Sequence, residues 1–257
     1  MWYHLLFVIL TIISDYHRVT AIVNNRQPYN SHRSQQPAPV NNPSIVSIEV
    51  KGNHRCGGSI ISPSYLLTSA QCVSDYQNKT DILKIRANTT IKESGGLEYQ
   101  VEKVIVHSDY GYTDNLNPVN DIAAVKVKKT FDMKVLQPIK ILDRESRLSL
   151  NAFGFISGYG LTENGTSLEL NKVGIPLIDN ENCNDIYEEF GGLQDGQICA
   201  GYLRGGRGFC KGDEGGPLVV NGWLTGIASW SIGCGSSWPA IYTKISYYWD
   251  WIYELDE

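Results

Sequence analysis

The chain has 257 residues, of which 42% are hydrophobic and 19% are charged, and its formal net charge at pH 7 is -5. A chain of this length buries roughly 70–75% of the surface that its unfolded form exposes, so it suits one large or two small domains and excludes disordered and fibrous classes. The acidic balance, with no long run of Lys or Arg, makes nucleic acid and anionic membranes poor partners.

The first segment has the features of a secretory signal peptide. Leu5 to Ile13 is an apolar run broken only by Thr11, and polar residues and the small Ala21 follow it. The run is too short to cross a bilayer, which needs about 20 residues. We therefore expect residues 1–21 to be a signal peptide and the chain to be secreted and extracellular; a buried first strand is the alternative.

The next segment, residues 22–42, is polar and contains prolines, which predicts a propeptide-like or disordered arm. From Ile45 onward, short apolar runs rich in β-branched and aromatic residues recur between turn-forming residues, which is typical of an all-β barrel or sandwich. The main runs are Ile45–Val50, Ser59–Ile61, Tyr65–Leu67, Ile82–Ile85, Tyr99–Val106, Ile122–Val127, Ala152–Ile156, Leu218–Val220, Trp223–Ser229 and Ile241–Ile245.

Helical periodicity is clear only at the C-terminus. Ile245, Tyr248, Trp249 and Ile252 follow the i, i+3, i+4, i+7 spacing of one helix face. A weaker helical stretch covers residues 180–190.

The six cysteines form an even set of three neighbour pairs along the chain. Their spacing does not match a zinc site and the five histidines do not cluster with them, so we expect disulfides and no metal. Six cysteines allow 15 connectivities, so the spacing alone does not fix the pairing. Three sequons, at Asn78, Asn88 and Asn164, are candidate N-glycosylation sites and fit an exported chain. We expect His54 and His107 to lie on the surface or in loops.

Five blocks of the sequence resemble segments of trypsin-like serine proteases and occur in that family's order. The blocks are Cys56–Cys72, Asn120–Val127, Cys210–Val219, Ser229–Cys234 and Pro239–Lys244. The resemblance runs from about Pro43 to the C-terminus and implies one homology domain over residues 43–257. It also implies an all-β fold of two six-stranded antiparallel β-barrels, at about 43–145 and 146–245, with a C-terminal α-helix over 245–255. The disulfides implied are Cys56–Cys72, Cys183–Cys199 and Cys210–Cys234.

The resemblance also implies a catalytic triad, of which this sequence keeps only Asp121. The histidine position before Cys72 is Gln71, and the serine position after Asp213 is Glu214. An amide does not take up a proton near pH 7, so Gln71 cannot act as the general base. A carboxylate is a poor nucleophile toward a peptide carbonyl, so we expect a pseudoprotease rather than an enzyme. We expect Asp121 to serve as a structural acceptor for Ser229 and Gln71.

The remaining site positions follow from the same resemblance. The oxyanion hole would use the backbone N–H groups of Gly212 and Glu214, and the pocket positions are Gly208, Ser229, Trp230, Ser231 and Ala240. A trypsin has aspartate where this chain has Gly208, so attraction for a Lys or Arg side chain is absent. Ile22-Val23-Asn24-Asn25 lacks the glycines of the family's cleaved amino terminus, so we expect a zymogen-like loop around Asp213. Glu214 beside Asp213 and Asp121 predicts a blocked or acidic cleft.

The paired Gln and Glu replacements resemble the inactivated serine protease paralogues of scabies mites. That resemblance implies a secreted, monomeric scaffold without cofactors that binds proteins, including host complement components, and interferes with host defence. Two alternatives are a protease-homologue cofactor in a proteolytic cascade and a residual serine-type endopeptidase.

Overall fold

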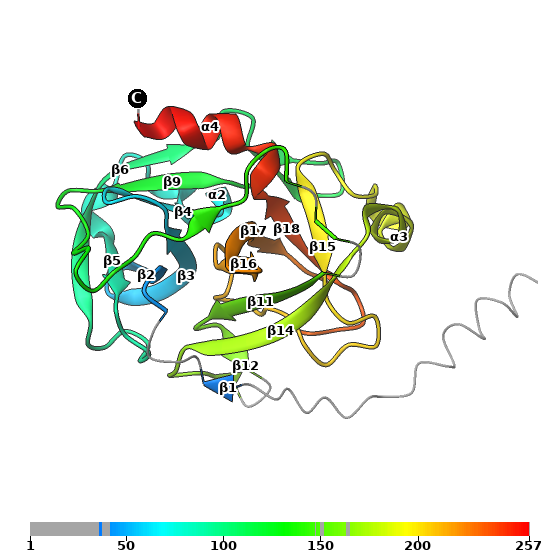
Figure 1. The fold of residues 1–257 in the computed structure, drawn as a ribbon, viewed down its shortest axis with the longest axis horizontal. Helices are drawn as coiled ribbons and strands as arrows, with labels where there is room; N and C mark the ends of the chain where they lie inside the picture. The colour runs from blue at the N-terminus through cyan, green and yellow to red at the C-terminus, as the bar shows by residue number, and fades with distance from the viewer. Residues whose placement is uncertain (1–35, 38–41, 147, 150–151, 163–164, 257) are drawn as a thin grey trace, which may run out of the picture. The chain divides into compact units, whose positions relative to one another are not determined.

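The computed structural model describes residues 36–37, 42–146, 148–149, 152–162 and 165–256. The signal peptide expected over 1–21, most of the arm expected over 22–42, and the sequon at Asn164 lie outside these residues. Within the described part, short strands dominate and helices are few and short (Figure 1).

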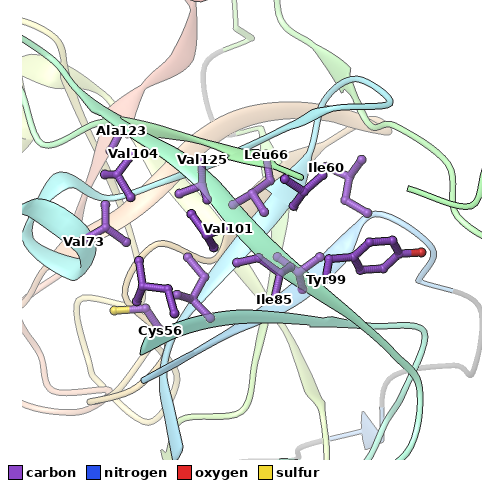
Figure 2. Close-up of a cluster of buried hydrophobic side chains, with 14 of the residues drawn as sticks. Cys56, Ile60, Leu66, Val73, Ile85, Tyr99, Val101, Val104, Ala123 and Val125 are labelled. Carbon is purple, nitrogen blue, oxygen red and sulfur yellow. The ribbon is translucent and has the colours of Figure 1, made fainter. Parts of the chain in front are cut away.

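The first half of the chain forms a closed antiparallel barrel of six strands in the order β2-β3-β4-β9-β6-β5. These strands are β2 (Ile45–Val50), β3 (Asn53–Ile60), β4 (Tyr65–Thr68), β5 (Leu83–Ala87), β6 (Leu97–Val106) and β9 (Ala123–Val127). Their buried side chains meet inside the barrel, and Figure 2 shows Val101, Leu66 and Ile85 pointing toward one another from three different strands. Burial of such side chains stabilises the fold by about 1.5–3 kcal/mol each.

Strand β6 shows how alternation and a bulge place side chains in this barrel. Tyr99 and Val101 point inward and alternate with exposed Glu98 and Gln100, as a half-buried strand requires. The next inward residue is Val104, three positions later, because the register with β9 shifts between Val101 and Lys103. An extra residue in one strand of a pair restores the apolar face in this way.

The second half forms a second ring of six antiparallel strands, in the order β14-β11-β16-β17-β18-β15, which the pairing of β14 with β15 closes. The strands are β11 (Phe153–Gly158), β14 (Asn171–Ile178), β15 (Gln197–Ala200), β16 (Pro217–Val220), β17 (Trp223–Trp230) and β18 (Ala240–Lys244). Two short strands extend it: β1 (Gln36–Pro37) pairs antiparallel with β14, and β10 (Lys140–Ile141) pairs parallel with β17. The two-barrel architecture is therefore confirmed.

Strands β14 and β15 are absent from the apolar runs recognised in the sequence. In β14 the buried residues Val173, Ile175 and Leu177 alternate with Gly174 and Pro176, which are typical of turns. Proline is tolerated here because only its carbonyl is used, as acceptor for the N–H of Gly201.

The expected helices are present in shorter form. The helix α4 spans Trp249–Tyr253 and lies between the 3₁₀ turns Ile245–Tyr247 and Glu254–Asp256. Ile245, Tyr248 and Ile252 pack with Leu67 of β4 and Leu224 of β17, so the C-terminal segment covers the seam between the barrels (Figure 1). The expected stretch at 180–190 contains α3 (Asn180–Ile186) and the 3₁₀ turn Glu188–Phe190.

The remaining short elements are the helix α2 (Ala70–Val73), the 3₁₀ turns Ser74–Tyr76 and Thr80–Ile82, and the strand pairs β7 (Gly111–Tyr112) with β8 (Pro118–Val119) and β12 (Leu161–Thr162) with β13 (Gly165–Thr166). The disulfides join Cys56 to Cys72, Cys183 to Cys199 and Cys210 to Cys234, which is the neighbour pairing that the family resemblance implies.

Candidate functional site

The three positions that match the triad meet at the junction of the barrels. Gln71 lies in α2, just after β4, and Asp121 lies two residues before β9, which pairs with β4. Ser229 lies near the end of β17 in the second barrel, and Glu214 lies in the loop before β16. Residues more than 100 positions apart in sequence are therefore in hydrogen-bond contact here, since Ser229 Oγ donates to Asp121 Oδ2 at 2.6 Å.

Asp121 is a buried acceptor surrounded by donors. Its side chain is 1% exposed, and its two oxygens accept from the backbone N–H of Gln71 at 2.9 Å, from Gln71 Nε2 at 2.7 Å and from Ser229 Oγ at 2.6 Å. Burial raises the pKa of Asp121, and the hydrogen bonds from Ser229 and Gln71 oppose that effect by stabilising the charged form. The structural-acceptor role expected for Asp121 agrees with this geometry.

The amide of Gln71 has a fixed orientation. Its Nε2 donates to Asp121 Oδ2 at 2.7 Å and to the carbonyl oxygen of Ser229 at 2.8 Å, so both amide hydrogens are used. The opposite orientation would place the amide oxygen against two acceptors, which excludes it. Gln71 therefore bridges the barrels as a double donor and presents only its oxygen as a free polar atom.

The side chain of Glu214 folds back onto its own loop. Its Oε2 accepts from the backbone N–H of Gly212 at 2.6 Å, and its own backbone N–H also stabilises the carboxylate. These are the two N–H groups assigned above to the oxyanion hole. Burial is the main cause that raises the pKa of Glu214, with the negative charge of Asp213 as a further one, while the two N–H groups oppose the rise. An anion built into the chain thus occupies the pair of donors.

The loop around Asp213 is held in a defined conformation. The Asp213 carboxylate accepts from the backbone N–H of Gly160 at 2.7 Å and from that of Cys210 at 2.9 Å. Gly212 has φ of +96°, a backbone conformation that favours glycine, and this directs its N–H to Glu214. The N–H groups of this loop therefore converge on one carboxylate, and the zymogen-like arrangement expected from the sequence stays a prediction. Residues 22–25, on which that expectation partly rested, lie outside the described part of the chain.

His54 connects the first barrel to this loop, a role that the sequence reasoning missed. Its Nε2 lies 2.8 Å from the carbonyl oxygen of Gly212 and its Nδ1 lies 2.7 Å from Ser47 Oγ. Because a carbonyl only accepts, Nε2 must carry the hydrogen, and Nδ1 accepts from the serine hydroxyl. Burial lowers the pKa of His54 to about 4, so the ring is neutral near pH 7. His107, also expected in a loop, packs half-buried against the rings of Tyr248 and Trp251.

The positions that match the specificity pocket lie on facing segments, but the floor is closely packed. Gly208 is buried, and a Cβ added to it would lie 3.1 Å from the Cα of Gly235. A carboxylate at position 208 would therefore require the Gly235 segment to move. Ser231 follows β17 directly, and Ala240 begins the neighbouring strand β18.

Aromatic rings gather beside these positions. Trp230 and Trp238 both lie against Tyr187, with ring centroids 5.2 and 5.6 Å apart, and Trp238 also contacts Phe190 at 5.4 Å. The backbone of Phe190 is tied to the opposite barrel, because Asn117 Nδ2 donates to its carbonyl oxygen at 3.0 Å. Trp238 therefore serves in packing, and contacts between loops of the two barrels restrict this side of the cleft.

On the other side of Gln71 and Glu214 lies a cavity of about 440 Å³, hereafter the basic cavity. Its lining includes Arg55, Lys92 and Lys211, while Glu214 is the one carboxylate among its described lining residues. The expectation of an acidic cleft is wrong for this half of the site. Asp121 is buried behind Gln71 and Asp213 is turned toward Gly160, so neither of these carboxylates lines the cavity. The sequence did not predict that these three cations lie together, because they come from separate segments. The position of Arg55 next to Cys56, and of Lys211 next to Gly212, was the one weak sign in the sequence that they lie near the site.

The sequons that the structure describes are accessible, since Asn78 and Asn88 are both exposed. Among the described residues, no group of three or more His, Cys, Asp or Glu side chains could hold a metal ion. In the same part of the chain, no helix is both long enough and apolar enough to cross a membrane.

Comparison with known proteins gives a consistent family. The family model "Trypsin" matches residues 31–252. Trypsin Blo t 3 of Blomia tropicalis is 36% identical over 218 residues, which cover 82% of this chain and 80% of that protein. Trypsin 5G1 of Aedes aegypti is 30% identical over 210 residues, covering 80% and 77% of the two chains. Transmembrane protease serine 11G of Mus musculus is 36% identical over 215 residues, 80% of this chain but only 50% of the mouse protein. The chain belongs to the trypsin family of serine proteases and their homologues.

Proposed function

We propose that this protein is a secreted, proteolytically inactive member of the trypsin family that acts as a protein-binding scaffold. The observation that carries the proposal is the Glu214 carboxylate, which accepts from Gly212 N–H at 2.6 Å at the position where the family has its nucleophile. The same side chain replaces the hydroxyl nucleophile and fills the donors that would stabilise the transition state.

The base is missing as well. A serine protease needs a group that takes the proton of the hydroxyl and returns it to the leaving amine. Gln71 stands beside Asp121 in the geometry of the family's histidine, but both of its amide hydrogens already serve Asp121 and Ser229. An amide does not titrate near neutral pH, so Asp121 has no imidazolium to stabilise.

The size of these losses supports complete inactivity. In well-studied enzymes with the same triad, loss of the catalytic serine or histidine lowers kcat by on the order of 10⁶, and loss of one oxyanion-hole donor costs about 10²–10³. The remaining rate over water in such enzymes comes from the oxyanion hole and substrate binding. Here the Glu214 carboxylate occupies a donor of the oxyanion hole, and Gly208 leaves the pocket floor without a carboxylate to bind a Lys or Arg side chain.

Secretion and protein binding are supported by features outside the site. Three disulfides suit an oxidising, extracellular environment, and the apolar run Leu5–Ile13 suits a signal peptide. The likeness to a mite trypsin, Blo t 3, agrees with the resemblance to inactivated mite paralogues. By that analogy we propose that the partners are host defence proteins, among them components of complement.

Catalytic status is tested by covalent labelling. The purified protein is incubated with a broad serine-reactive phosphonate, beside an active trypsin as positive control. We expect labelling of the trypsin and none of this protein. Labelling of any residue, or ester hydrolysis lost in Glu214→Ala, would support the residual endopeptidase instead.

A second test asks whether the chemistry can be restored. The double substitution Gln71→His with Glu214→Ser returns the family's base and nucleophile. We expect it not to cleave Arg or Lys esters, because Gly208 leaves the pocket without a carboxylate. Substantial cleavage by the double variant would show that the substrate site is intact.

The scaffold role is tested by complement-mediated lysis of red cells in serum. We expect dose-dependent inhibition by this protein and none by the phosphonate-blocked trypsin used as a matched control of the same fold. Unchanged lysis at molar excess removes complement from the proposal. Acceleration of another protease's cleavage would favour the cascade-cofactor alternative.

A further inference from the structure

The basic cavity gathers positive charge in a chain that is acidic overall. Arg55, Lys92 and Lys211 line a single cavity of about 440 Å³, although the chain has a net charge of -5. They come from three separate segments, before Cys56, after β5 and before Gly212, so only the fold brings them together. A volume of a few hundred Å³ is typical of a ligand site.

These cations are not neutralised by the chain itself. Ion pairs join Lys84, Arg86, Lys126 and Arg144 to carboxylates elsewhere in the described structure, whereas none involves Arg55, Lys92 or Lys211. Unpaired cations around one concave surface attract anions more strongly than the same charges scattered over a convex one.

Two of the cations are held in place by the backbone. Arg55 donates from Nε to the carbonyl oxygen of Cys72 at 2.8 Å and from Nη2 to that of Gln71 at 3.3 Å. Lys92 donates from Nζ to the carbonyl oxygen of Tyr159 at 3.0 Å. Each keeps further N–H donors for a ligand, and less side-chain entropy is lost on binding because the side chains are already ordered.

Among the nearby carboxylates, Glu214 offsets part of this charge, since the positive charge of Lys211 acts to lower its pKa. Glu214 lines the cavity, but its oxygens serve the N–H groups of Gly212 and of Glu214 itself. Glu93 lies beside His54 and accepts its backbone N–H at 2.7 Å, and it does not line the cavity. A carboxylate entering the cavity would therefore find unpaired donors and one negative group.

We propose that the basic cavity binds an acidic segment of a partner protein, with Asp or Glu side chains contacting Arg55, Lys92 and Lys211. This inference rests on the proposed function, since a chain that does not cleave can retain a segment lying along its cleft. Three cations around one cavity favour a segment with a few carboxylates over a long polyanion, which would require a continuous basic stripe across the surface. Leu161 adds an apolar wall for the aliphatic part of such a segment.

The test measures binding of a short fluorescent peptide of Asp and Glu to the full protein, by anisotropy at physiological ionic strength. A Lys and Arg peptide of equal length is the reverse-charge control. We expect saturable binding of the acidic peptide alone. Lys92→Gln and Lys211→Gln should each weaken it about three- to tenfold. Lys129→Gln, an exposed lysine outside the cavity, should change it less than about twofold.

A variant that removes a negative charge from the cavity should have the opposite effect on binding. Glu214→Gln removes the cavity's carboxylate and should strengthen binding of the acidic peptide, with folding of every variant checked by circular dichroism. Absence of saturable binding, or an equal effect of Lys129→Gln and Lys92→Gln, overturns the proposal. Tighter binding of heparin than of the peptide overturns the choice of a protein segment. A protein that resists the phosphonate but binds no peptide refutes this inference alone, whereas a labelled protein refutes the proposed function.

Discussion

The partly buried His54 at the junction of the barrels should make this fold sensitive to acid. Burial lowers the pKa of His54 from 6.5 to about 4, because the charged ring would lose its hydration between Ser47, Tyr159 and the Gly212 carbonyl. The unfolded chain then binds the proton more tightly than the folded one. The stability that His54 contributes is fully present above pH 6.5 and is lost as the pH falls through about 4.

The size of the loss follows from this pKa difference. Between about pH 7.5 and about pH 4.5, linkage gives a decrease of about 2.5 kcal/mol in the free energy of unfolding. In a domain of this size that corresponds to a decrease of about 5–10 °C in Tm. The measurement is thermal unfolding by circular dichroism at both pH values, for the unmodified protein and for His54→Gln.

The glutamine variant separates His54 from other titrating groups. We expect a lower Tm for His54→Gln at neutral pH, because the hydrogen bonds to Gly212 and Ser47 are weakened, but a smaller decrease on acidification. Asp121 and Glu214 have raised pKa values and act in the opposite direction, and they are present in both proteins. If both proteins lost the same Tm on acidification, the assignment of a buried neutral ring to His54 would be refuted.

Three further outcomes are expected from the same physical argument. Because burial raises the pKa of Glu214, its ionised form destabilises the fold above that pKa, so Glu214→Gln should raise Tm at neutral pH and lose this advantage in acid; a constant difference across pH would contradict the reasoning. Gln71→Ala removes the Nε2 donor from buried Asp121 and from the carbonyl oxygen of Ser229, and it should cost about 1–3 kcal/mol in denaturant unfolding, with Gln71→His as the hydrogen-bonding control. Replacing Cys56 and Cys72 together by alanine opens a loop of 16 residues and should cost about 3 kcal/mol, whereas an unchanged Tm would show that the bridge contributes no stability.

Strands and helices were predicted correctly where the local residue pattern is typical of the element that forms. The β-branched and aromatic residues of Tyr99–Val106 predicted a strand, and the spacing of Ile245, Tyr248 and Ile252 predicted the C-terminal helical segment. β14 was not predicted because Gly174 and Pro176 are typical of turns. Pairing with β11 on one side and β15 on the other holds Asn171–Ile178 as a strand. Local propensity is a weak guide when pairing partners on both sides determine the conformation.

For the candidate site, too, some features could be predicted from the sequence and others depended on the tertiary structure. The identities of Gln71 and Glu214 predict the loss of base and nucleophile on chemical grounds alone, because an amide does not titrate and a carboxylate is a poor nucleophile. Where those side chains point was decided by the tertiary structure. The Glu214 carboxylate turns back to Gly212 because two N–H groups converge there, and this depends on the φ of Gly212 and on His54 from the other barrel.

The charge of the cleft shows most clearly a property that the tertiary structure decided. The family resemblance places Glu214 beside Asp213 and Asp121, which predicted a blocked or acidic cleft. The fold instead buries Asp121, turns Asp213 away and brings Arg55, Lys92 and Lys211 to one cavity. The sequence alone predicted the family and, through that resemblance, the disulfide pairing, the β-architecture and the loss of the usual catalytic groups, because these depend on residue identity and spacing. The charge that a partner meets was determined only by the tertiary structure, because electrostatic attraction depends on distance and burial, and segments far apart in the chain set both.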